Sequence, residues 1–374
     1  MPAIEFTTNR HPTLGIELEL GLVDLQSCDL TNAFDRLIEK LPDRGANRFK
    51  PEIIQSVIEI NTDVCQSIGE AERDLRGRLG VVEAAADSLG LGLWWGGVHP
   101  FARCEAQQVT PDERYLKLVE LLQVLARRMM TFGLHVHVGV DSGDKAVMIC
   151  DRIMRHLPTL LALSASSPFW EGEATGLHSY RSKVMEGLPT AGLPPLMRNW
   201  SEYVWLVNHM VGTGFINTIR ELWWDVRPHH NFGTVEIRMC DMPGNLEDVL
   251  TLAALMQCLV KSLSDEIDQG AYQHDCHPLL VAQNKWRAAR YGNKAQLVDS
   301  NTYAAHTLPQ IVDNLVERLS PTAEDLGCRE YLERNRQLAA GPSWAERQLT
   351  LAQQNGGLSA MVRQVIAQSR VTGA

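Results

Sequence analysis

Short segments in which apolar and polar residues alternate constrain the fold of this chain more than any other feature. A two-residue period is typical of β-strands with one buried face and one open face. The alternation, or in one case a Leu- and Trp-rich run, predicts strands at 16–22, 56–64, 90–97, 134–138 and 234–240. In the first of these, the leucine side chains would point one way while Glu17 and Glu19 point the other.

Apolar stripes with a 3.6-residue period lie between these segments and predict helices. The clearest would start with Thr110 as N-cap and Pro111 in the first turn, with Glu113 completing a capping box, and its stripe reaches Met129. Further stripes lie at 145–163, 246–267 and 344–368. Helices mixed with hairpin-like strand pairs, without strict βαβ alternation, predict an α+β fold with a mainly antiparallel sheet.

The sequence contains no low-complexity tract, no fixed-period repeat and no long Gly/Ser linker. We therefore expect residues 1–374 to form one domain with helices at its C-terminal end. The eight cysteines form no CxxC pair, so neither a zinc ribbon nor a disulfide framework is indicated.

The charge balance is acidic, with 45 Asp and Glu against 35 Lys and Arg and a net charge of −10. This balance argues against nucleic acid as a partner, because nucleic-acid binding depends on clustered basic residues. No apolar run approaches the ~20 residues needed to cross a bilayer. Residues 1–12 also lack the apolar core of a secretion signal, so we expect a cytoplasmic protein without a membrane partner.

Four glutamates lie on the polar side of otherwise apolar strands: Glu17, Glu19, Glu59 and Glu236. Two carboxylates about 5 Å apart repel by about 3 kcal/mol at an effective dielectric constant of about 20, so such a face needs compensating cations. Hard divalent ions meet that need, and Mg²⁺ keeps positions open for phosphate oxygens. Glu52 would join the same side if the second strand extended that far.

A solvated acidic sheet face is the competing interpretation for any single glutamate. That interpretation weakens for the whole set because His135, His137 and Arg238 share the face, a mixture that suits metal, phosphate and transferred charge. His135 and His137 alone would also fit a zinc site. A zinc site needs fewer acids, however, so the surplus favours Mg²⁺ or Mn²⁺.

Neither a GxxxxGK[ST] loop nor a GxGxxG motif is present in the sequence. The phosphates of ATP would therefore have to be held by metal ions and arginines. Three candidate arginines lie close to Glu236 in the sequence: Arg220, Arg227 and Arg238. Three more lie further away: Arg181, Arg287 and Arg290.

Three motifs resemble those of the bacterial carboxylate-amine ligases classed as type 2 glutamate-cysteine ligases: 15–19 (GIELE), 135–139 (HVHVG) and 233–238 (GTVEIR). Further matches, spread over nearly the whole chain, lie at 62–65, 99–101, 179–181, 224–228 and 287–292. The same motif order also resembles glutamine synthetase. That resemblance implies a curved antiparallel sheet that holds metals on its concave face, with helices packed on its outer face.

The resemblance also implies two metal sites. Glu19, Glu52 and Glu59 would hold the metal nearer the amino-acid substrate, although the family often has Asp at the position of Glu52. The ligands of the metal nearer the ATP phosphates would be Glu17, His135 and Glu236.

The remaining site residues are assigned by the same resemblance. His137 would face the nucleotide, and Arg238 would meet the transferred phosphoryl group. Arg181, Arg220 and Arg227 would contact phosphate or the substrate carboxylate. The catalytic candidates are Arg238, Glu236 and Glu59.

The implied reaction uses ATP to phosphorylate a carboxylate, nominally the γ-carboxylate of glutamate. The amine of cysteine or another amino compound then attacks the acyl phosphate. Amino acids are thus the expected small-molecule partners, and the resemblance suggests a homo-oligomer, at least a dimer. Two alternatives stay open at this point: a metal-dependent amidohydrolase that works without ATP, and a non-catalytic amino-acid-binding member of the fold.

Overall fold

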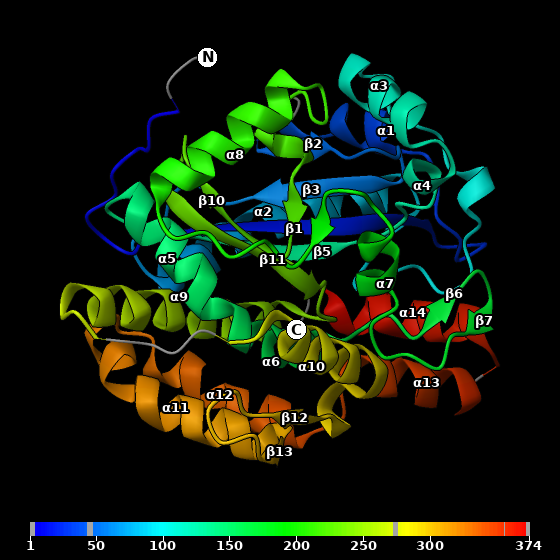
Figure 1. Ribbon diagram of the computed structural model, residues 1–374. Coiled ribbons are helices and arrows are strands. Elements are labelled where there is room, and N and C mark those ends of the chain that lie inside the picture. The colour runs from blue at the N-terminus through cyan, green and yellow to red at the C-terminus, as the bar shows by residue number, and fades with distance from the viewer. Residues whose placement is uncertain (1–3, 43–47, 272–275, 355, 372–374) are drawn as a thin grey trace.

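A computed structural model describes residues 4–42, 48–271, 276–354 and 356–371. Within these residues seven strands form one sheet in the order β10-β11-β5-β1-β3-β2, with β4 paired to β1 (Figure 1). The strands are β1 (Leu14–Asp24), β2 (Phe49–Pro51), β3 (Val57–Asn61), β4 (Leu91–Trp94), β5 (Gly133–Gly139), β10 (Val226–His229) and β11 (Thr234–Asp241). All of their pairings are antiparallel.

The described part of the chain also contains fourteen α-helices. They are α1 (Phe34–Ile38), α2 (Ile68–Ser88), α3 (Glu113–Leu122), α4 (Val124–Arg127), α5 (Gly143–Ile153), α6 (Leu157–Ser164), α7 (Arg181–Glu186), α8 (Trp200–Gly212), α9 (Leu246–Asp268), α10 (Pro278–Tyr291), α11 (Leu308–Asp325), α12 (Arg329–Ala340), α13 (Trp344–Gln354) and α14 (Leu358–Ser369). None of the described helices is both long and apolar enough to cross a bilayer.

Small pairs of strands lie outside the main sheet: β6 (Phe169–Trp170) with β7 (Glu173–Ala174), β8 (Ala191–Gly192) with β9 (Trp223–Trp224), and β12 (Gln296–Val298) with β13 (Ala305–Thr307). Only β8 and β9 run parallel among the described pairs.

A layer of helices covers one face of the sheet. Strands of the sheet contact α2, α5, α6, α9 and α14, and α9 contacts α2, α5 and α6 within this layer. The C-terminal α11 and α12 pack in turn on α9 (Figure 1). Helix α9 is therefore buried along most of its length, as its largely apolar sequence requires. The expected α+β class, with a mainly antiparallel sheet backed by helices, is confirmed.

Strand β1 explains why the other face stays open. Its Leu14, Ile16, Leu18 and Leu20 are at most 1% exposed, because they point into the helical layer. The alternate residues, including Glu17, are only half-buried. Pairing with β3 and β5 on either side holds these alternate side chains on the opposite face.

Strand register brings the predicted polar residues into opposed pairs. Glu17 lies opposite His135 across β1 and β5, and Glu236 lies opposite His137 across β11 and β5. Similarly, Glu19 lies opposite Glu59 across β1 and β3. Residues directly opposite each other share a sheet face, so these side chains meet although they are far apart in the sequence.

A register shift between Ile237 and Cys240 interrupts the pairing of β11 with β5 and places Arg238 in an irregular stretch of the strand. The Arg238 backbone N–H instead donates to the Asp225 carbonyl oxygen at 2.8 Å. Bulges of this kind bend a strand and re-aim its side chains, and they are common beside functional sites.

The predicted helix start at Thr110 is wrong. Thr110 donates its backbone N–H to Ile53 and its hydroxyl to the Glu52 carbonyl oxygen at 2.6 Å, so this stretch is extended. Asp112 caps α3 by accepting from the Arg114 N–H at 2.8 Å. The stripe towards 129 is broken after Leu122 by a residue with positive φ, at position 123.

Other predicted boundaries also shift. The stripe at 145–163 divides into α5 and α6 at a 3₁₀ turn, where Pro158 enters the first turn of α6. The stripe at 344–368 divides into α13 and α14, and Gly357 precedes α14 with φ +90°. The stripe at 246–267 matches α9. Strand β3 is shorter than predicted, so Glu52 follows β2 and does not extend β3.

Candidate active site

The open face of the sheet forms the floor of a cavity of about 300 Å³. Its described lining includes every residue that the sequence assigned to a metal or a catalytic role: Glu17, Glu19, Glu52, Glu59, His135, Glu236 and Arg238. The cavity is also lined by the residues predicted to contact the nucleotide, its phosphates or the substrate carboxylate: His137, Arg181, Arg220 and Arg227. Arg287 and Arg290, on α10, are not among the described lining residues.

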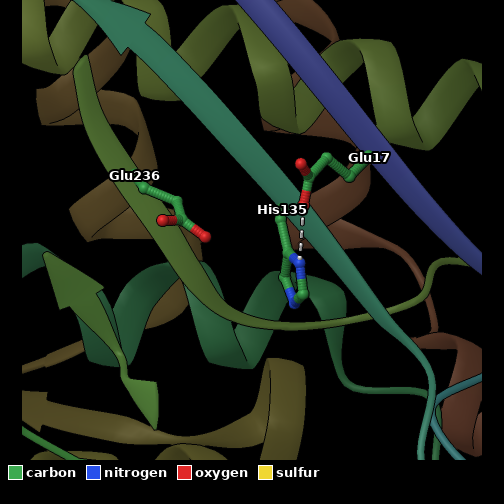
Figure 2. Close-up of side chains that lie close together, drawn as sticks. All are labelled: Glu17, His135 and Glu236. Carbon is green, nitrogen blue, oxygen red and sulfur yellow. Dashed lines mark hydrogen bonds and ion pairs between the residues drawn. The ribbon is translucent and has the colours of Figure 1, made fainter. Parts of the chain in front are cut away.

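One group of potential metal ligands, the His135 cluster, consists of Glu17, His135 and Glu236. A ligand atom from each lies within 4.8 Å of the others, and Figure 2 shows the three side chains converging from β1, β5 and β11. The His135 Nδ1 atom is 3.3 Å from a Glu17 carboxylate oxygen. Burial alone would raise the pKa of Glu17, but His135 and His137 outweigh it and hold that pKa well below its ordinary value.

A second group, the Glu52 cluster, consists of Glu19, Glu52 and Glu59, whose ligand atoms also lie within 4.8 Å of one another. Burial, together with the negative charges of Glu59 and Glu19, raises the pKa of Glu52 well above its ordinary value. Such a shift marks a site with too little positive charge. Lys50 supplies part of the missing positive charge, since its Nζ atom lies 3.2 Å from a Glu59 carboxylate oxygen.

His137 lies between the His135 cluster and one end of the cavity. Its Nδ1 atom shares a 2.9 Å hydrogen bond with the Thr234 hydroxyl. Its Nε2 atom is 3.5 Å from Glu17 Oε1 and 3.8 Å from Glu236 Oε1. Burial would lower the pKa of His137, but the charges of Glu236 and Glu17 raise it above its ordinary value.

Two observations show that the donor set fits divalent cations. Among the described residues, the buried His137 Nε2 atom has no hydrogen-bond partner. The Glu52 cluster, in turn, gathers three carboxylates around one point. Carboxylate oxygens with one imidazole are ligands that suit Mg²⁺ or Mn²⁺ better than a soft metal.

Arg238 and Arg227 both pair with Glu236. Arg227 donates Nε to Glu236 Oε2 at 2.7 Å and Nη2 to Oε1 at 3.3 Å, and its remaining Nη1 bonds the Ile219 and Leu222 carbonyl oxygens. Arg238 forms an ion pair with Glu236 through Nη1. Burial would raise the pKa of Glu236, but these two arginines hold it well below its usual range.

The predicted arginines differ in how many of their guanidinium donors are already bound. Arg227 is fully engaged in orienting Glu236, and Arg181 is buried with its guanidinium donating to the Met239 and Arg238 carbonyl oxygens at 3.2 and 3.3 Å. Arg220 is exposed at the cavity rim. Arg238 lines the cavity next to the Glu236 carboxylate with which it pairs.

Several lining residues escaped the sequence analysis: Lys50, Arg114, Tyr115, His229, Asn231 and Phe232. A signal existed for Lys50, which precedes Glu52 by two residues and pairs in register with Glu59. The segment that carries His229 is too short, and too interrupted by proline, to show an alternating pattern.

The amino-acid sequence was compared with the sequence profiles of known protein families. A sequence profile described as glutamate-cysteine ligase family 2 matches residues 13–364. The chain belongs to this family. The resemblance of its motifs to type 2 glutamate-cysteine ligases is thereby confirmed, as is the expectation that it is a ligase forming carbon–nitrogen bonds.

Similar proteins cover most of the chain. A Frankia alni protein with the provisional name glutamate–cysteine ligase 2-1 is 45% identical over 333 residues, covering 88% of this chain and 87% of its own. A Gloeobacter violaceus protein, provisionally named glutamate–cysteine ligase 2, is 40% identical over 362 residues, or 96% and 97% of the two chains.

Solved structures support the fold assignment. The glutamate–cysteine ligase of Francisella tularensis, solved in complex with AMP, superposes with a TM-score of 0.72 at 14% identity, covering 98% of this chain and 90% of that chain. The bifunctional glutathione synthetase of Pasteurella multocida gives a TM-score of 0.71 at 15% identity, over 96% of this chain and 52% of that chain.

Proposed function

We propose that this family member is an ATP-dependent ligase that joins the γ-carboxylate of glutamate to the amine of cysteine or another amino compound. The observation that carries the proposal is the pair of ligand clusters side by side on β1. Glu17 and Glu19 lie two residues apart on one strand, which separates the clusters by about 7 Å. This spacing suits two cations that face one polyphosphate and one carboxylate.

The family resemblance suggests which cluster would hold which cation. The His135 cluster would hold the cation nearer the phosphates, and the Glu52 cluster would hold the cation nearer the amino-acid substrate. When bound, Mg²⁺ or Mn²⁺ would supply positive charge at the phosphate oxygens and at the attacking carboxylate, which otherwise repel each other.

The chain's own residues position and stabilise charge. Arg227 fixes both oxygens of Glu236, and Arg238 lies against the same carboxylate with its guanidinium lining the cavity. A preorganised guanidinium at this point would stabilise the charge that develops on the transferring phosphoryl group. Arg238 is thus proposed as a catalytic residue, with Glu236 and Glu59 as catalytic and metal-binding residues.

The reaction has two balanced steps. A γ-carboxylate oxygen of glutamate attacks the γ-phosphorus of ATP, and ADP leaves. The amine nitrogen then attacks the acyl carbon, phosphate leaves with the bridging oxygen, and the nitrogen loses one proton. The AMP bound to the Francisella tularensis enzyme supports nucleotide use on this fold.

The experiment is an assay of ADP release with glutamate, cysteine and Mg²⁺, with the amide product identified by mass spectrometry. Glu17→Gln and Glu59→Gln should abolish both signals, because each removes a ligand of one cluster. Glu330→Gln is the matched control, since Glu330 is exposed on α12 and pairs with Arg334, one turn further along the same helix. Amide hydrolysis without ATP would instead identify an amidohydrolase.

We further propose a cytoplasmic protein that acts as a homodimer with amino acids as its small-molecule partners. Family resemblance supports the dimer. Exposed apolar side chains, including Leu121 on α3, Val124 on α4 and Trp205 on α8, offer apolar area that a second copy could cover.

A further inference from the structure

A buried lysine outside the cavity has no role in the site described so far. Lys285, on α10, is 3% exposed and is not among the described lining residues of the cavity. Its Nζ atom lies 2.5 Å from a carboxylate oxygen of Asp225 and 2.8 Å from one of Glu186. Burial would lower the pKa of Lys285, but the charges of these two carboxylates raise it above its ordinary value. The lysine is therefore a charged group held between two acids.

Asp225 links this lysine to the cavity. It lies between β9 and β10 and is buried. Its backbone N–H donates to the Gly192 carbonyl oxygen at 2.8 Å, and its carbonyl oxygen accepts from the Arg238 N–H at 2.8 Å. Asp225 thus binds the lysine through its side chain and holds Arg238 through its main chain.

The main chain of Arg238 depends on contacts of this kind. Its pairing with β5 is interrupted, because the register of β11 shifts between Ile237 and Cys240. Asp225 accepts its N–H, and Arg181 Nη2 donates to its carbonyl oxygen at 3.3 Å. Since a buried backbone N–H rarely lacks an acceptor, a displaced Asp225 would also displace the main chain from which the Arg238 guanidinium reaches the cavity.

We propose that Lys285 is a positioning residue for Arg238: the lysine fixes Asp225, and the Asp225 carbonyl oxygen fixes the Arg238 main chain. This inference rests on the proposed function and deepens it, because it extends the support of the same site to α10. Helix α10 packs on α6, and α6 contacts β11. The ammonium therefore starts from an element that is itself held against the strand carrying Arg238, as precise positioning requires.

The test measures kcat and KM by ADP release from glutamate, cysteine and Mg·ATP. Lys285→Met keeps the unbranched side chain and removes the charge, so Asp225 loses its partner. It should lower kcat by about 10- to 100-fold and leave the KM for ATP nearly unchanged, because a displacement of about 1 Å at a reacting group has effects of this size. Asp225→Asn keeps the backbone carbonyl oxygen and weakens the ion pair. It should give the same pattern with a smaller loss, including where Lys285→Met does not fold.

A double variant distinguishes positioning from general destabilisation. If Lys285 acts through the Arg238 guanidinium, its removal matters little once that guanidinium is gone. Adding Lys285→Met to Arg238→Lys should therefore lower kcat by less than about 2-fold further. Two independent effects would instead multiply.

The matched control is Lys145→Met on α5. Lys145 is also buried, with its Nζ atom 2.8 Å from Asp141 and 2.9 Å from Asp268, and it is not among the described lining residues of the cavity. Its replacement should lower the urea midpoint but leave kcat unchanged. Hydrogen–deuterium exchange adds a readout that does not depend on turnover: the Arg238 amide should exchange faster in Lys285→Met than in Lys145→Met or wild type.

Any of four results would overturn the inference while leaving the proposed function standing. They are wild-type kcat in folded Lys285→Met, unchanged exchange at the Arg238 amide, losses that multiply in the double variant, and an equal fall of kcat in Lys145→Met. A wild-type protein that releases no ADP would refute the proposed function instead, and the exchange comparison would still test the positioning.

Discussion

Replacing Glu52 by glutamine should stabilise the protein without divalent cations, and added Mg²⁺ should reduce or remove that gain. The ligand atoms of the Glu52 cluster lie within 4.8 Å of one another. At about 5 Å and an effective dielectric constant of about 20, each charged pair repels by about 3 kcal/mol. Lys50 offsets part of this repulsion through Glu59, so the cluster stays short of positive charge.

The sign follows from the pKa of Glu52, which is raised in the folded protein by burial and by Glu59 and Glu19. A carboxyl whose folded pKa exceeds its unfolded pKa destabilises the protein once the pH rises above the unfolded value. At pH 8 without divalent cations, Glu52→Gln should therefore increase the free energy of unfolding by about 1–3 kcal/mol.

Added Mg²⁺ should reduce or remove this advantage. A cation present at about 100 times its Kd stabilises the folded state by about 2.7 kcal/mol, and Glu52→Gln loses a ligand that this gain requires. Urea unfolding in EDTA and in saturating Mg²⁺ measures both effects, with Glu330→Gln as the exposed control. A variant that is less stable than wild type in EDTA would show that Glu52 is not destabilising there, and one that gains as much from Mg²⁺ as wild type does would show that Glu52 is not a ligand.

Three other predictions concern Arg238, a buried ion pair and assembly. Arg238→Lys should lower kcat by about 10² to 10³ with little loss of ATP affinity, because lysine lacks the planar fork; near-normal kcat with a raised KM for ATP would contradict this. Lys285→Met should lower the free energy of unfolding by about 3 kcal/mol, because the buried ammonium lies 2.5 Å from Asp225 and 2.8 Å from Glu186. Urea unfolding measures this loss, and a negligible loss would show that water screens this network. Light scattering should give twice the 41.8 kDa chain mass, and a particle of 41.8 kDa at micromolar concentration would count against the dimer.

Much of the sheet and its polar face could be predicted, because the two-residue period of a strand fixes which side chains share a face. Glu17 and Glu19 had to lie together once β1 was recognised, and register with β5 then brings His135 to Glu17. The apolar length of α9 was equally clear, since a long 3.6-residue stripe admits few other structures.

Features set by tertiary contacts could not be predicted. Glu52 reaches its cluster because the chain between β2 and β3 is held by Thr110, and the sequence gives no sign of that contact. Thr110 has the local signature of a helix cap, yet its pairing with Ile53 keeps it extended. The side chain of Phe232 is exposed, so no periodic pattern points to it.

Isotope transfer would show whether the chain phosphorylates a substrate carboxylate. The purified protein would be given ATP, Mg²⁺, cysteine and glutamate labelled with ¹⁸O in its γ-carboxylate, and the released phosphate would be analysed by mass spectrometry. Each phosphate should carry one ¹⁸O atom, because the oxygen that attacks the γ-phosphorus leaves with it when the amine attacks. Phosphate released with ADP but without ¹⁸O would contradict it.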